Sequence, residues 1–60
     1  MTIHDVVENL FDGMEMTAEQ GKIAEKELER LRSNKGWSYE QLDDWCWADS
    51  NRAFDYIFGA

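Results

Sequence analysis

The sequence predicts an all-α fold: one domain over residues 1–60, built as a small bundle of three principal helices with a break or kink near Asp49 in the last. Three observations support this. Apolar residues recur at helical spacing along the chain, helix-start signals precede the second and third apolar segments, and neither proline nor an alternating strand pattern occurs. Sixty residues are close to the lower limit for folding without a metal, a disulfide or oligomerisation.

The first predicted helix has Thr2 placed to cap its N-terminus, and Gly13 lies where a C-terminal cap is expected. Between them the apolar residues follow a spacing of 3, 1, 3, 1 and 3, which is typical of the buried stripe of an amphipathic helix. The stripe consists of Ile3, Val6, Val7, Leu10, Phe11 and Met14.

The second predicted helix begins at a capping box, in which Thr17 is followed three residues later by Gln20. Its stripe is narrow, and the segment ends at the Asn-Lys-Gly turn of residues 34–36. The stripe residues are Ala24, Leu28 and Leu31, with Ile23 beside them.

The third predicted helix begins at a second capping box, Ser38 to Gln41, and continues through Leu42, Trp45 and Cys46. Residues 49–51 are Asp-Ser-Asn, which favour helix caps, so we expect the break there. A last short helical segment then carries Ala53, Phe54, Ile57 and Phe58 and ends at Gly59.

One long helix over residues 3–33 is the alternative, because apolar or small residues keep a heptad spacing there, including Val7, Leu10 and Leu28. Gly13 and Gly21 would each cost about 1 kcal/mol inside such a helix. The broken version is therefore favoured.

The charge is strongly asymmetric. Thirteen acids and six bases give a net charge of −7, and five of the six bases lie between residues 22 and 35. Both ends are anionic, so phosphates of nucleic acids and acidic lipid headgroups would repel them. The basic block is interleaved with glutamates, which indicates a solvated helix face.

The single cysteine excludes an internal disulfide, and the chain has neither a signal-peptide pattern nor an apolar stretch of about 20 residues. We therefore expect a cytoplasmic protein that binds neither membranes nor nucleic acid directly. Catalysis is not expected, since the one histidine, His4, and the one cysteine, Cys46, are far apart in sequence. No metal or cofactor site is expected either.

A regular series of acids occupies the first third of the chain. On a continuous helix these acids would form one line with a repeat of roughly 5 Å, comparable to the ~3.4 Å step of phosphates along a DNA strand. Such a line suits a DNA mimic, while a simpler interpretation is the polar face that any amphipathic helix needs. The series is Asp5, Glu8, Asp12, Glu15 and Glu19.

Seven of the eight aromatic residues lie between Trp37 and Phe58. Trp45 and Trp47 are two residues apart, so on a helix they point about 200° from each other. At least one of them should be partly exposed, or buried only by another chain. Exposed tryptophan and tyrosine are typical anchors of protein interfaces, although a ring half covered at the domain edge is also possible.

Residues 31–42, Leu-Arg-Ser-Asn-Lys-Gly-Trp-Ser-Tyr-Glu-Gln-Leu, resemble the opening of repressor-type helix-turn-helix domains. In such a family the following helix, here about residues 50–58, would enter the major groove. This chain departs from that pattern, because Arg52 is accompanied there by Asp49 and Asp55, which phosphates would repel.

The sequence is best interpreted as a small acidic protein-binding module, an inhibitor or regulator of phage or mobile-element type that blocks a host protein with a basic surface. A DNA mimic that occupies the nucleic-acid site of a DNA-binding protein is one alternative. A self-assembling structural subunit is another, and a homodimer is compatible with all three. The expected partner-binding residues are Asp5, Glu8, Asp12, Glu15, Trp37, Glu40, Asp43, Asp44, Trp45, Trp47 and Tyr56.

Overall fold

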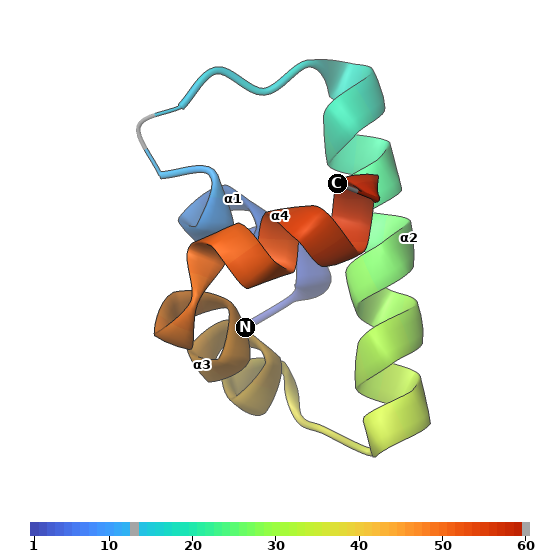
Figure 1. The fold of residues 1–60 in the computed structure, drawn as a ribbon. Coiled ribbons are helices and arrows are strands. Elements are labelled where there is room, and N and C mark those ends of the chain that lie inside the picture. The colour runs from blue at the N-terminus through green and yellow to red at the C-terminus, as the bar shows by residue number, and fades with distance from the viewer. Residues whose placement is uncertain (13, 60) are drawn as a thin grey trace.

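The computed structural model describes residues 1–12 and 14–59, and these residues form four helices without strands (Figure 1). The predicted all-α class is confirmed. The number of helices differs from the predicted three, because the chain is fully interrupted at Asp49 and does not merely kink. The helices are α1 (Ile3–Leu10), α2 (Ala18–Lys35), α3 (Tyr39–Ala48) and α4 (Ser50–Phe58).

Helix α1 begins at a capping box made by Thr2 and Asp5. The Thr2 hydroxyl accepts a hydrogen bond from the Asp5 backbone N–H at 3.3 Å, and the Asp5 carboxylate accepts one from the Thr2 backbone N–H at 2.9 Å. The helix ends at Leu10, with Phe11 as its C-cap. The predicted cap at Gly13 lies outside the described residues.

Helix α2 confirms both of its predicted ends. Thr17 and Gln20 form the N-terminal capping box, at 3.0 and 3.1 Å, and Gly36 ends the helix in the left-handed conformation at φ 69°. Since the described residues between Leu10 and Ala18 are not helical, the alternative of one long helix over residues 3–33 is wrong.

The break between α3 and α4 has a local cause. Asp49 is extended, at φ −157° and ψ 91°, so α3 cannot continue through it. Its carboxylate accepts a hydrogen bond from the Arg52 backbone N–H at 3.1 Å and thereby caps α4. At the other ends, Ser38 and Gln41 form the predicted capping box of α3, and Gly59 closes α4 in the left-handed conformation.

Both α1 and α4 pack against α2 and α3, and α4 crosses in front of α1 in Figure 1. The core is therefore shared by all four helices. The predicted stripe of α1 is shorter than expected, because Ile3 is only partly buried and Met14 is exposed. The core residues are Val6, Val7, Leu10, Phe11, Ala24, Leu28, Leu31, Leu42, Cys46, Ala53 and Ile57.

The core also contains the heptad residues Val7, Leu10 and Leu28, which pack within one protomer. They are thus not free to form a seam between two chains. Of the helices in the described part of the chain, none has the length and apolar composition needed to cross a bilayer.

Candidate partner-binding surface

The two neighbouring tryptophans have different environments, as the sequence predicted. Trp47 is 65% exposed, whereas Trp45 is partly buried and packs against the core. Leu42 and Cys46 fix the buried side of α3, and the two rings lie on either side of it. The prediction that at least one tryptophan is exposed is confirmed, and the exposed one is Trp47.

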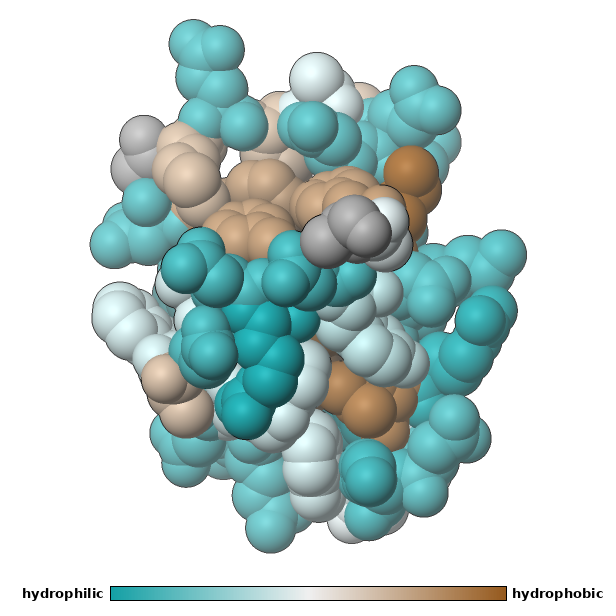
Figure 2. Space-filling view, in the orientation of Figure 1, coloured by the Kyte–Doolittle hydropathy of each residue, from teal (hydrophilic) through white to brown (hydrophobic). Residues whose placement is uncertain are grey.

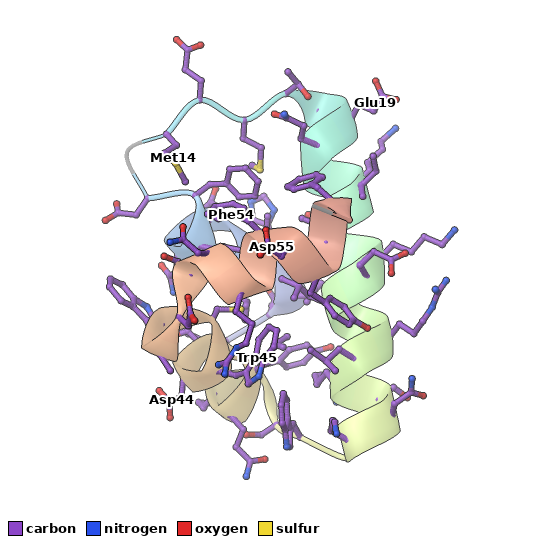
Figure 3. The ribbon with its side chains drawn as sticks, viewed as in Figure 1. Met14, Glu19, Asp44, Trp45, Phe54 and Asp55 are labelled. Carbon is purple, nitrogen blue, oxygen red and sulfur yellow. The ribbon has the colours of Figure 1, made fainter. Side chains whose placement is uncertain are left out.

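Trp45 lies below α4 in Figure 3 and is partly buried. Its ring meets Tyr56 edge-on, with the centroids 6.1 Å apart, and Trp37 lies 6.2 Å away on its other side. The guanidinium of Arg52 lies over the ring at 4.6 Å. The structure therefore brings together the predicted site residues Trp37, Trp45 and Tyr56. Their rings contact one another, so the contacting faces are not open to a partner.

Trp47 lines a shallow hollow of about 220 Å³ together with Asn9, Leu10, Cys46 and Ser50. The hollow lies where the end of α1 meets the junction of α3 and α4. The sequence analysis did not single out Asn9, Leu10 or Ser50, because their proximity to Trp47 depends on how α1 packs against α3.

The thiol of Cys46 is 2% exposed at the wall of this hollow. Burial, and secondarily the negative charge of Asp43, raise the pKa of Cys46 to about 11. A thiol with that pKa is protonated near neutral pH and is a poor nucleophile.

Acidic side chains surround Trp47 on its own helix. Glu40, Asp43 and Asp44 precede it by seven, four and three residues, which places all four side chains on one side of α3. We call these four residues the α3 face. The α3 sequence contains no lysine or arginine, so the acids on this face are not neutralised by their own helix.

The acids of the α3 face are not equivalent. The Asp43 carboxylate accepts a hydrogen bond from the Asn9 side-chain amide at 3.3 Å, which ties α3 to the end of α1. Asp44 is exposed and points away from the core in Figure 3. Asp44 is therefore available to a partner, while Asp43 also has a structural role.

The acidic series of the first third is divided between different structures. Asp5 and Glu8 lie on α1, Asp12 and Glu15 lie in the connection, and Glu19 lies on α2. The line of charges that a continuous helix would give is therefore not formed.

Two of those acids also have partners within the protomer. The Thr2 backbone N–H lowers the pKa of the Asp5 carboxyl, and Glu8 lies 3.0 Å from the ring nitrogen Nε2 of His4. They contribute negative charge, but they are partly committed to stabilising α1.

The basic residues of α2 are accompanied by acids, as the sequence suggested. Arg30 lies 3.6 Å from Glu27, and the guanidinium of Arg32 pairs with Glu29. Arg32 also donates a hydrogen bond to the Trp37 carbonyl oxygen at 3.0 Å and lies over the Tyr39 ring. Two of the five bases of this helix, Arg30 and Arg32, are therefore paired with acids.

Among residues 1–12 and 14–59, no three His, Cys, Asp or Glu side chains are grouped so that they could hold a metal ion. No protein-family model, curated protein or solved structure shows a significant match to this chain. A functional conclusion therefore depends on the chain's own surface, where the α3 face and its hollow are the most distinctive feature.

Proposed function

We propose that this protein is a small acidic protein-binding module that inhibits or regulates a partner protein with a basic surface. The observation that supports it most is the position of Trp47, which is 65% exposed beside a hollow and surrounded on α3 by acids without a base. Tryptophan is enriched among the residues that dominate interface energies.

The exposed part of the Trp47 ring is large enough to account for substantial affinity. A tryptophan side chain buries up to ~250 Å², and apolar burial contributes about 25 cal/mol per Å². Covering the part that is still exposed would contribute a gross gain of up to about 4 kcal/mol, part of which the entropy cost of association offsets. The surrounding acids would speed the encounter with a basic surface and favour partners of that charge.

The DNA-mimic alternative has weaker support, because its acids do not share one helix. The self-assembling alternative also has weaker support, because Val7, Leu10 and Leu28 are occupied within the protomer. Both would nevertheless give distinct results in the experiment below.

The experiment is capture of the natural partner on the immobilised full chain, followed by affinity measurement with the purified partner. Trp47→Ala should weaken binding at least about 30-fold, the loss typical of an interface hot spot, without unfolding the domain. Ile23→Ala is the matched control, since Ile23 is an exposed apolar residue on α2, and it should change the affinity less than threefold.

Three results would contradict the proposal. The first is equal binding by the Trp47→Ala and native chains. The second is a partner that DNA displaces from this protein and whose binding is weakened only by substitution of the acids at residues 5–19. The third is recovery of nothing but the chain itself.

A further inference from the structure

A second apolar surface lies on α4, apart from the α3 face. The rings of Phe54 and Phe58 stack with an interplanar angle of 14° and centroids 6.4 Å apart. Both meet the buried ring of Phe11 edge-on, at 5.2 and 6.3 Å. The pair is therefore held in place by the core, yet Phe58 is 42% exposed.

Met14 extends this surface from the connection between α1 and α2. Its backbone N–H donates a hydrogen bond to the Phe11 carbonyl oxygen at 2.7 Å, and its side chain, 51% exposed, extends toward Phe54 in Figure 3. Figure 2 shows apolar side chains gathered in a band above α4. We call Met14, Phe54 and Phe58 the phenylalanine patch, and Phe11, only 8% exposed, belongs to the core behind it. None of its residues lines the hollow beside Trp47.

The surroundings of the phenylalanine patch are anionic. Asp12 and Glu15 flank Met14 in the connection, and Asp55 follows Phe54 on α4. All three are exposed. The one base of α4, Arg52, is engaged with Trp45. A ligand for this surface would thus meet apolar rings with carboxylates around them.

Charge and area both argue against a second copy of this chain as the occupant. A second copy would bring its own net charge of −7 and place the same acids opposite Asp12, Glu15 and Asp55. A stable interface also needs about 800 Å² per partner. That would be a fifth of the 4003 Å² surface of this protein, far more than the three side chains of the phenylalanine patch supply.

A cationic polypeptide with apolar side chains suits both the exposed rings and the carboxylates around them. The described elements are all helices, so no strand edge is available for an extended peptide to join. An amphipathic helix can instead lay its apolar side chains on the rings while its lysines or arginines reach the acids. The flexible thioether of Met14 can adapt to such side chains.

We infer that the phenylalanine patch docks a basic amphipathic helix of a partner protein. The inference rests on the proposed function in one respect, that the partner is a protein with a basic surface. It adds a second contact, so the protein would engage its partner at two separate places, Trp47 and the phenylalanine patch.

The test uses the full chain and two synthetic 18-residue peptides. In both peptides, leucines at the spacing i, i+3, i+4 and i+7 form one apolar face of a helix. The remaining positions are lysine in one peptide and glutamate in the other. Amide chemical shifts of the labelled protein locate the binding site, and a titration gives the dissociation constant. We expect the lysine peptide to bind and to shift the amides of Met14, Phe54 and Phe58.

Substitutions then test the site. Phe58→Ser should weaken binding of the lysine peptide at least tenfold, while the matched control Ile23→Ser, at an exposed apolar residue of α2 outside both surfaces, should change it less than twofold. If Phe58→Ser unfolds the domain, Met14→Ser serves instead, since Met14 is more than half exposed, and it should weaken binding at least threefold.

Four results would overturn the inference. In the titrations these are no binding of the lysine peptide, equal binding of the glutamate peptide, or amide shifts confined to the residues around Trp47. The fourth is self-association of the free protein through Phe58, measured by light scattering. The proposed function fails separately, if Trp47→Ala leaves capture of the natural partner unchanged.

Discussion

The guanidinium carbon of Arg52 lies 4.6 Å from the centroid of the Trp45 ring, and Nη2 of the same side chain donates a hydrogen bond to the Trp45 carbonyl oxygen at 3.1 Å. Arg32 has a similar relationship to Tyr39, also at 4.6 Å. These arginines cover aromatic rings at the surface. They also draw two of the six bases into contacts within the protomer.

Replacing Arg52 by alanine should destabilise the fold by about 1 kcal/mol, because an exposed cation–π contact contributes ~0.5–1 kcal/mol and a hydrogen bond a similar amount. The Trp45 ring would become more accessible, so tryptophan emission should shift to longer wavelength. Urea unfolding and fluorescence measure the two effects. Arg30→Ala, which removes a surface pair with Glu27, should cost less than about 0.5 kcal/mol. Equal costs for the two variants would contradict a special role for Arg52.

Gly21, inside α2, and Gly36, at its C-cap, should respond in opposite directions to alanine. Gly36 has a φ of 69°, which side chains with a Cβ adopt only at a cost, so Gly36→Ala should destabilise by about 1 kcal/mol. Gly21 is helical, and a Cβ there would lie 3.4 Å from Sδ of Met16, an ordinary contact. Gly21→Ala should therefore stabilise by up to about 1 kcal/mol. Urea midpoints compare the variants, and destabilisation at both positions would show that the Met16 contact is too tight.

Most helix ends were predictable because their signals are local, whereas the end of α1 at Leu10 was not predicted. Each capping box joins residues only three apart, such as Ser38 and Gln41, and Gly36 and Gly59 end their helices by their own backbone conformation. The break at Asp49 was likewise encoded in one side chain that accepts a hydrogen bond from Arg52.

The binding surfaces were only partly predictable, because they depend on packing between helices. Spacing showed that Trp45 and Trp47 diverge, but not that Arg52 and Tyr56 would cover Trp45. The exposure of Phe58 was missed as well. A signal was present: α4 has adjacent apolar pairs at 53–54 and 57–58, a stripe wider than the core buries.

His4 should make stability depend on pH. A hydrogen bond to Glu25, aided by the charge of Glu8, raises the pKa of His4 above its ordinary value of 6.5. Since the folded pKa is the higher one, protonated His4 stabilises the fold. This contribution is complete below the unfolded pKa and is lost as the pH rises through the folded pKa.

An NMR titration of the His4 ring measures this pKa directly. Glu25→Gln should lower the His4 pKa, and His4→Gln should remove the corresponding step from the dependence of the urea midpoint on pH. A native pKa at or below 6.5 would show that the pairing with Glu25 is not maintained in solution.

Reversing the charge of Asp44 should slow association with a basic partner more than it changes dissociation. Asp44 is exposed on the α3 face, and charges at the edge of an interface act mainly on the encounter rate. The association rate of Asp44→Lys should fall severalfold at low salt, and the difference should shrink once the Debye length falls to about 8 Å near 0.15 M salt. Stopped-flow measurements over a salt series provide both rates.

Glu19→Lys is the matched control for this prediction, since it makes the same change in net charge on α2, at the other end of the molecule in Figure 3. If position matters, Glu19→Lys slows association less than Asp44→Lys does. Equal effects would mean that net charge alone attracts the partner, so the α3 face would have no directing role. A larger effect at Glu19 would point to the acids of residues 5–19, which is the result expected of a DNA mimic.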